Sequence, residues 1–336
     1  MIALARESRG LSQKELAEAL KLSAAKLCVV EQEDQTLSDS DFEKMTKLLL
    51  YPKEFFQQEG EAYLPVSINF RKREKVAQKL LTPIEAQINV YRLNIERLAE
   101  KAKFPSSKVP VLDIFKVGSP QEAARQLRKA WKLPKGPVKN MTQLLEENGV
   151  IVVIFDFGTE RVDSRTILTK DKHPVVVVNQ SMLGDRQRFS LAHGLGHLVM
   201  HAFLFPSFER DMNHEANLFA AEFLMPENDI KKDFADGVTF QKLMELKRKW
   251  KVSMQAILYR AADLNVITPN QKRYLISQFH AMKIMRREPV ELDIPKEKPR
   301  LLRDMITKVK TAQRLSVKEM ATFLCLEEKE FIERFT

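Results

Sequence analysis

The feature that most constrains this chain is a run of apolar residues and histidines between Arg186 and Phe203, which reads RQRFSLAHGLGHLVMHAF. The apolar residues recur at mostly helical spacing, which predicts one helix. His193 and His197 stand four residues apart and therefore lie on the same face of that helix. Two imidazoles at this spacing are the arrangement that holds a zinc ion. His201 extends the row, but three histidines drift around a straight helix, so we do not expect all three to share one metal.

A second stretch lies downstream, from Asn213 to Pro226, and reads NHEANLFAAEFLMP. Together with LAHGLGHLVMH, it resembles the ImmA/IrrE family of zinc metallopeptidases, and the resemblance extends over nearly the whole chain. It implies that His193 and His197 correspond to the zinc-binding pair of an HExxH motif, and that the second stretch supplies a third, carboxylate ligand. It also implies a zincin-like α+β core that follows an XRE-type helix-turn-helix, as in bacterial regulators that cleave a repressor or an antitoxin.

Two positions depart from the family pattern. The glutamate of HExxH, which acts as general base on the zinc-bound water, is replaced by Gly194. The position of the third ligand holds Asn213, whose neutral carbonyl is a poor zinc ligand beside a carboxylate. Glu215 lies most of half a helical turn away and cannot simply take over. We therefore expect a pseudo-enzyme with no intact catalytic residue, in which zinc is either held weakly by His193, His197 and Asn213 or lost.

The remaining chain divides into segments with different patterns. Residues 63–110 are predicted to be a helical connector, residues 111–232 the zincin-like α+β core, and residues 233–336 a helical C-terminal domain. Arg186 and Arg188, just before the histidines, either orient a substrate or pair with acidic residues. The core is expected to hold three strands, at residues 150–155, 165–169 and 174–178.

Residues 1–62 are predicted to form an all-α helix-turn-helix domain. The segment from Leu11 to Leu22 reads LSQKELAEALKL and contains the capping-box pattern of Ser12 and Glu15. The segment from Leu315 to Leu326 reads LSVKEMATFLCL and repeats this pattern. The repeat predicts a second small helix-turn-helix-like unit at the C-terminus, which either packs on the body or binds a partner.

The charge of the first domain bears on whether it reads DNA. The helix after its turn would contact DNA through Ser23, Lys26 and Gln32. Residues 1–60, however, contain eight Lys or Arg against eleven Asp or Glu, whereas DNA binders gain affinity by neutralising phosphates. A module for dimerisation or protein contact is therefore an equally good interpretation. Basic clusters that offer better DNA contacts lie at 247–251 and 283–287, and another basic run lies at 70–75.

Composition and charge bound the class of protein. The chain is 44% hydrophobic and 30% charged, as in soluble globular proteins. Its two cysteines, Cys28 and Cys325, provide neither a disulfide framework nor a cysteine-based zinc site, which suits the cytoplasm. The first ten residues carry Arg6, Glu7 and Arg9 in place of a signal-peptide core, and no apolar run is long enough to cross a membrane. The net charge of +10 favours acidic partners, nucleic acid among them.

Three functions are consistent with these patterns. The first is a regulator of the stress-response, mobile-element, toxin–antitoxin or phage-defence type, whose degenerate peptidase core binds a protein or peptide partner without cutting it. The second is an active zinc endopeptidase that cleaves a repressor or antitoxin with a displaced ligand and a substitute base. The third is a DNA-binding transcriptional regulator in which the core is a sensor. XRE-type modules often dimerise, so a homodimer is a further expectation.

Overall fold

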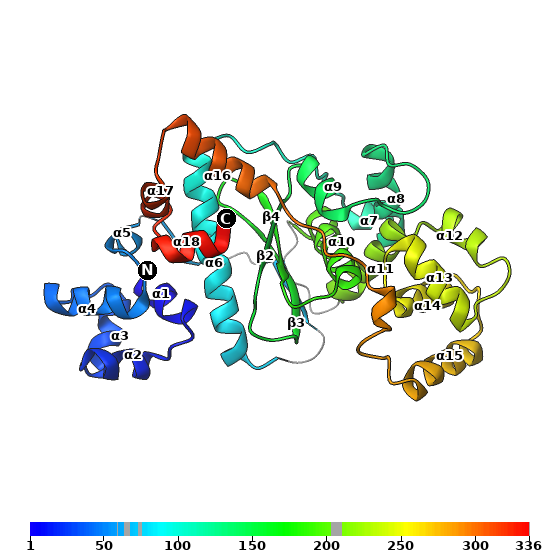
Figure 1. Ribbon diagram of the computed structural model, residues 1–336, viewed down its shortest axis with the longest axis horizontal. Helices are drawn as coiled ribbons and strands as arrows, with labels where there is room; N and C mark the ends of the chain where they lie inside the picture. The colour runs from blue at the N-terminus through cyan, green and yellow to red at the C-terminus, as the bar shows by residue number, and fades with distance from the viewer. Residues whose placement is uncertain (59, 64–67, 73–75, 203–209, 336) are drawn as a thin grey trace.

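The computed structural model describes residues 1–58, 60–63, 68–72, 76–202 and 210–335 (Figure 1). The fold is α+β, with a small sheet in the middle of the molecule and helices on either side of it. The strands are β1 (Ile68–Lys72), β2 (Ile151–Phe155), β3 (Val162–Leu168) and β4 (Pro174–Asn179). The helices are α1 (Ile2–Ser8), α2 (Gln13–Leu20), α3 (Ala24–Glu31), α4 (Asp39–Leu49), α5 (Lys53–Phe56), α6 (Gln78–Lys101), α7 (Ile114–Val117), α8 (Pro120–Ala130), α9 (Met141–Glu147), α10 (Gly184–Met200), α11 (Met212–Leu224), α12 (Glu227–Asp233), α13 (Phe240–Trp250), α14 (Met254–Asp263), α15 (Pro269–Ala281), the 3-10 helix η1 (Val290–Leu292), α16 (Leu301–Ala312), α17 (Val317–Phe323) and α18 (Glu328–Phe335).

The four strands form one mixed sheet in the order β1-β3-β4-β2. β2 runs parallel to β4, with Ile151 opposite Val175, and the other two pairs are antiparallel. Branched apolar residues fill β2 and β4, because such side chains pack well on a pleated, buried surface. The three strands expected from the sequence are confirmed, and β1 is an additional strand that the sequence analysis does not predict.

The sheet separates two apolar cores. Alternate residues of β2 and β4 point to opposite faces, as the pleat of a strand requires. Val152 and Val176 belong to one core, which also contains residues of α8, α10, α11, α13 and α14. Ile151 and Val175 belong to the other, which contains residues of α1, α2, α6 and α16–α18. Helix α10 is therefore held against one face of the sheet, with α11 and α8 stacked behind it.

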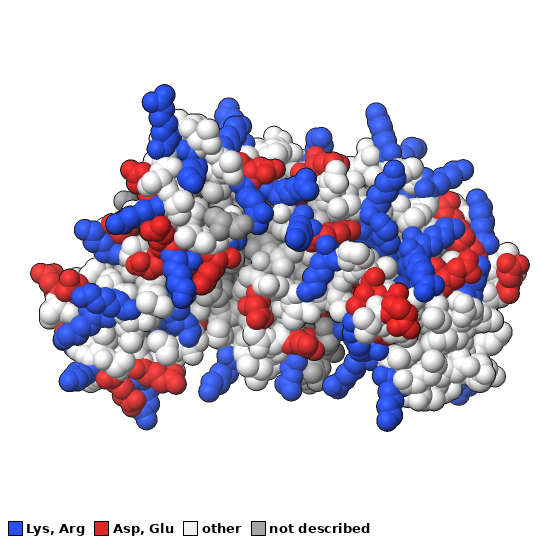
Figure 2. All heavy atoms as spheres, in the orientation of Figure 1, with Lys and Arg blue, Asp and Glu red and all other residues white. Residues whose placement is uncertain are grey.

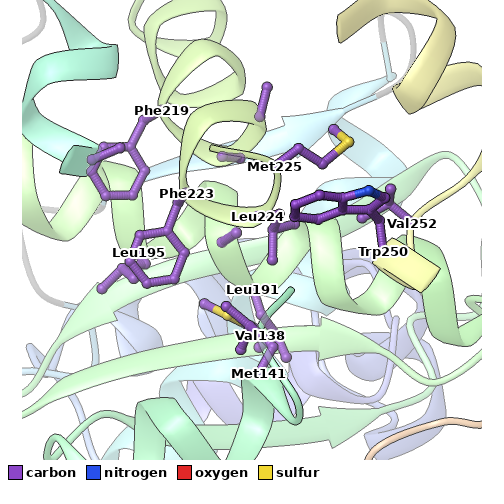
Figure 3. Packing of buried hydrophobic residues seen from close by; sticks show 14 of the residues in the cluster. Val138, Met141, Leu191, Leu195, Phe219, Phe223, Leu224, Met225, Trp250 and Val252 are labelled. Carbon is purple, nitrogen blue, oxygen red and sulfur yellow. The ribbon is translucent and has the colours of Figure 1, made fainter. Parts of the chain in front are cut away.

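Packing between α10 and α11 fixes the histidine helix from its outer side. Phe219 and Phe223 of α11 lie beside Leu195 and Leu191 of α10 in the first core (Figure 3). All four side chains are fully buried. Burial of a side chain of this size stabilises a fold by roughly 1.5–3 kcal/mol. The apolar spacing of both helices in the sequence thus has its physical basis in this contact.

The sequence predicts the helices more completely than it predicts the other segments of the chain. The stretch expected from 186 to 203 begins as a helix at Gly184 and ends at Met200, with His201 as its C-cap residue. Residues 233–336, expected to be helical, contain α13–α18 and η1 and no strand among their described residues. Among the described residues, no helix is both long enough and apolar enough to cross a lipid bilayer.

The two ends of the chain meet on α6. Helix α1 packs on α6, and α16 packs on α6 and on β2 (Figure 1). Leu4, Leu16, Leu302 and Phe331 are all buried in the same core. The four predicted domains stay a prediction, but this core joins residues of three of them with one face of the sheet.

Candidate functional site

Gly194, at the position of the general base, faces the sheet rather than an open cleft. A Cβ atom placed on it would lie 2.8 Å from Oγ1 of Thr166 on β3 and 2.9 Å from Cγ1 of Val176 on β4. Real Cβ atoms do not approach other atoms this closely, because the repulsion forces neighbours to move. The helix therefore lies nearer to the sheet at this point than any larger residue allows. A glutamate side chain has no room here in the present packing.

Two other glycines let α10 approach its other neighbours. A Cβ atom on Gly196 would meet the ring of Phe219 of α11 at 3.0 Å. One on Gly184, the first residue of the helix, would collide with the backbone carbonyl of Ile294. Residues 293–300 form an extended segment there, between η1 and α16. The glycines of α10 thus serve close packing on the sheet, on α11 and on this segment.

The three histidines of α10 form a ladder of hydrogen bonds. Nε2 of His193 lies 3.1 Å from Nε2 of His197, and Nδ1 of His197 lies 3.0 Å from Nδ1 of His201. All three side chains are almost completely buried. The ladder ends on α11 at both sides, where Nδ1 of His193 lies 3.0 Å from Oδ1 of Asn217 and Nε2 of His201 lies 2.8 Å from Oε2 of Glu215. Every ring nitrogen therefore has a hydrogen-bond partner.

Burial lowers the pKa of two of the three imidazoles. Burial, with the neighbouring His201 as a smaller cause, lowers the pKa of His197 to about 3, and its hydrogen bond to Asn213 offsets only part of this. Burial also lowers the pKa of His201, although the contact with Glu215 raises it. At the Asn217 end, Nδ1 of His193 donates to Oδ1 of Asn217, because a side-chain amide oxygen can only accept.

The ladder shows which histidines can share a metal ion. In a tetrahedral zinc site with bonds of 2.0–2.1 Å, two ligand nitrogens lie about 3.3 Å apart. The two Nε2 atoms of His193 and His197 are at nearly this separation. His201 faces the opposite nitrogen of His197 and so cannot reach the same ion. Of the three histidines, only His193 and His197 therefore have the spacing of two ligands of one zinc ion.

The described residues do not supply the third protein ligand that a catalytic zinc centre needs. Asn213 lies at an exposed position of α11 and hydrogen-bonds His197, but it offers no carboxylate. Glu215 is occupied by His201 and by Arg210, whose guanidinium makes three hydrogen bonds of 2.7 to 2.9 Å with it. Among the described residues, no group of three or more His, Cys, Asp or Glu could hold a metal ion. A catalytic zinc needs three protein ligands, and the described residues bring together only the two imidazoles of His193 and His197 at a suitable spacing.

Two arginines of α10 have different environments. Arg188 is fully buried, where it pairs with Glu297 and donates to the carbonyl oxygens of Val138 and Lys251. Of the two roles considered for it, this arrangement matches pairing with an acidic residue. Arg186 lies 3.6 Å from Asp163 and also lines the cavities described next.

Two adjoining cavities follow the outer face of α10. One, of about 600 Å³, is lined by α10, α11, α14 and residues 285–288, and it reaches Asn217 at the end of the ladder. The other, of about 920 Å³, extends to the β2–β3 loop at residues 159–161. Both share Leu183, Arg186, Met285 and Arg286. Together they form a groove with a positively charged middle, which we call the α10 groove.

The predicted DNA-contact residues lie on the surface of the first domain. Ser23, Lys26 and Gln32 are exposed at α3, and the hydroxyl of Ser23 accepts from the backbone N–H of Lys26 as a helix cap. Red and blue side chains alternate over these N-terminal helices, at the left of Figure 2, without a continuous basic patch on this face. Their role in DNA binding stays a prediction.

The basic cluster at 247–251 differs from its appearance in the sequence. Lys247 is fully buried, and its ammonium lies 2.5 Å from Asp185 and 2.6 Å from Glu288. Lys249 pairs with Asp233 at the surface. Lys247 therefore cannot contact a phosphate and instead fixes the start of α10. The basic run at 70–75 lies partly outside the described residues, and none of its side chains is described.

Comparison with known proteins bears on the core. Residues 145–262 match the Peptidase_M78 family model, described as the IrrE N-terminal-like domain. No curated protein matches the chain. The matched region contains the sheet strands β2–β4, both site helices α10 and α11, and α13. It therefore supports the ImmA/IrrE family for the region that holds the histidine ladder and the α10 and α11 walls of the α10 groove, whereas residues 285–288 of the groove lie outside the match.

Proposed function

We propose that this chain is a regulator of the ImmA/IrrE type whose peptidase-like core binds a protein or peptide partner and does not hydrolyse it. The observation that carries the proposal is the packing of Gly194 against Thr166 and Val176. General-base catalysis typically contributes about 10²–10⁴-fold to a rate. The glycine removes the carboxylate of the base. In addition, the sheet fills the space that the glutamate side chain would occupy.

Nearby groups do not replace the base. The three histidines bond to one another and to α11, so their ring nitrogens are not free to take a proton from water. Glu215 is held by Arg210. A candidate base must lie within hydrogen-bond reach of the reacting water with a pKa near the working pH. His197, whose pKa is about 3, is far from that condition.

The α10 groove provides the surface for a partner. Its walls contain apolar side chains, among them Phe189, Leu218 and Tyr259, and polar groups lie between them. Apolar walls with a few fixed polar groups are typical of ligand sites. A partner segment bound along α10 would run past Arg186 and Arg286 toward Asn217. The residues of the groove would bind and orient this segment without catalysing a reaction on it.

The first experiment measures zinc and hydrolysis together. Protein purified without chelator is analysed for metal content, with His193→Ala as control, and is then incubated with added zinc and a quenched fluorescent peptide library. We expect no cleavage by the wild type or by Gly194→Glu, because the glutamate cannot enter its position without displacing Thr166 and Val176. About one zinc per chain, lost in the control, together with cleavage, would contradict the proposal.

The second experiment measures binding. Peptides are selected by phage display on the wild type, and their affinities are measured by fluorescence polarisation. Arg286→Glu, which changes the middle of the α10 groove, should weaken binding about tenfold or more. Arg273→Glu, an exposed position on α15 outside the groove, is the matched control. Equal affinities for both variants would place the binding surface elsewhere.

An active zinc peptidase is the alternative that one observation favours, namely the 3.1 Å separation of the two Nε2 atoms. DNA binding is a separate proposal, which rests on the net charge of +10. A gel shift over a series of salt concentrations tests it, because phosphate contacts make affinity fall steeply with salt. If the chain does not bind DNA at low salt, the DNA-binding proposal is wrong.

A further inference from the structure

The C-terminal helices repeat the first three N-terminal helices in order and spacing. A constant shift of 304 positions takes Ser12 to Ser316 and Glu15 to Glu319. The same shift takes α2 onto α17 and α3 onto α18, and it takes α1 onto the second half of α16. The repeat in the sequence covers only one helix and its turn, whereas the structure extends it to three helices.

The backbone repeats in detail as well. Both copies begin their middle helix with a complete capping box, at Ser12 and at Ser316. After that helix, Lys21 and Cys325 adopt the same left-handed conformation, with φ of 57° and 55°. The hydrogen bond from Leu22 N–H to the Ala17 carbonyl has its equivalent in that from Leu326 to Ala321. Other helices of the chain are also followed by a left-handed residue, among them α8 by Lys132 and α15 by Lys283, so the agreement between the copies lies in the equal distance of this residue from the capping box.

Both copies use α6 as a common support. The side-chain amide of Gln87 donates to the carbonyl of Ser8 in the first copy, and its oxygen accepts from Arg334 in the second. Asn94 donates to the carbonyl of Leu324 at 2.6 Å. Phe331 and Phe335 of α18 are buried in the core that also holds Leu4 of α1. The second copy is therefore packed against the same helix as the first.

One equivalent pair of residues shows how the copies differ. Lys26, on the outward face of α3, corresponds to Glu330 on α18. Lys26 is exposed, whereas Glu330 turns inward and pairs with Arg9 of the first copy at 2.7 Å. Arg334, one turn later, lies over the ring of Tyr91 of α6. In the first copy, α3 would face a ligand. In the second copy, the equivalent helix α18 contacts the first copy and α6.

We propose that residues 301–335 are a built-in partner for the N-terminal helix-turn-helix-like unit, and that they take the place of a second subunit. The chain then acts as a monomer in place of the homodimer expected from the sequence. A ligand of the N-terminal unit meets one reading helix and not a symmetric pair. The proposal is independent of whether the core binds a peptide.

The test uses the full chain and two measurements. Sedimentation velocity over a range of concentrations should show a single species of 38.9 kDa, the mass of one chain. Glu330→Arg places a positive charge beside Arg9 and Arg334 and should release the second copy, which produces a two-chain species at higher concentration. Glu333→Gln, at an exposed position of the same helix, should behave as the wild type.

The second measurement detects release directly. Cys325 is fully buried in the turn of the second copy, so its alkylation rate reports opening of that copy. We expect Glu330→Arg to raise this rate on the order of tenfold or more relative to Glu333→Gln. A wild type that dimerises with concentration overturns the proposal. So does a folded Glu330→Arg that stays monomeric with an unchanged rate. If Glu330→Arg does not fold, Glu330→Gln is measured in the same way and decides between these outcomes.

Discussion

Gly194 combines two effects that the sequence shows only in part. The missing carboxylate is visible in the sequence, but the closed space beside it is not, because Thr166 and Val176 lie on strands far away in the chain. We predict that Gly194→Ala lowers the free energy of unfolding by about 1 kcal/mol. Alanine gains roughly 1 kcal/mol in helix propensity, but overpacking against Thr166 and Val176 costs about 1–3 kcal/mol.

A double-mutant cycle measured by urea unfolding tests this overpacking. In a Val176→Ala background, the methyl groups nearest to the new Cβ are absent. Gly194→Ala should then cost less than in the wild type, although the close approach to Oγ1 of Thr166 remains. An equal loss in both backgrounds would mean that the helix does not lie against the sheet at this point.

Lys247 is the residue whose role differs most from its appearance in the sequence. It belongs to a basic run, yet it is fully buried between Asp185 and Glu288. We predict that Lys247→Met lowers the free energy of unfolding by about 3–5 kcal/mol, because two buried carboxylates lose their counter-charge.

Urea unfolding of Lys247→Met is compared with that of Lys249→Met, whose side chain is half exposed. The control should lose less than about 1 kcal/mol, as is usual for surface pairs. The triple variant Lys247→Met, Asp185→Asn, Glu288→Gln should recover stability relative to Lys247→Met. No recovery would show that packing of the lysine stem, and not its charge, matters.

At the scale of elements, α10 was predicted well because its periodicity is local. Its four-residue histidine spacing follows from helical geometry alone. The partners of the ladder on α11 were not predicted, since a sequence does not tell which faces of two helices meet. Glu215 was considered only as a metal ligand, whereas it pairs with His201 and Arg210. β1 was missed because its sequence, INFRK, ends in two basic residues and lacks the apolar β-branched run that marks β2 and β4.

The buried ladder makes the stability of α10 depend on pH. The pKa of His197 is lowered from 6.5 to about 3, so the folded state stays neutral where the unfolded state takes a proton. Above about pH 6.5 the residue adds no pH dependence, and as the pH falls from there toward 3 the free energy of unfolding decreases. The slope is at most about 1.4 kcal/mol per pH unit.

Chemical unfolding at several values between about pH 7.5 and 4.5 measures this slope. His197→Gln should flatten it, although not completely, because the pKa of His201 is lowered as well. His173→Gln, at the half-buried turn between β3 and β4, is the control and should keep the slope of the wild type. A slope unchanged in His197→Gln would mean that this imidazole is not buried in a neutral state.

At the scale of the whole molecule, the sequence indicates an order of segments but not their division into cores. Residues near both termini share one core with α6, while residues 111–292 supply most of the other. Local patterns cannot show this, because the core that contains Leu4 also contains Phe331, which lies 327 residues further along the chain. Among the described strands and helices, only strands of the sheet contribute buried side chains to both cores.

A sheet with residues in both cores should make unfolding cooperative across the molecule. Both tryptophans, Trp131 and Trp250, belong to the first core, and Cys325 belongs to the second. We predict that tryptophan fluorescence and thiol exposure at Cys325 follow one urea transition. Val177→Ala, a fully buried change on the second-core face of β4, should shift both curves together by about 2 kcal/mol. Val290→Ala, at a largely exposed position, should shift neither. If Val177→Ala moved the thiol curve but not the fluorescence curve, the two cores would be separate folding units that share a sheet without coupling through it.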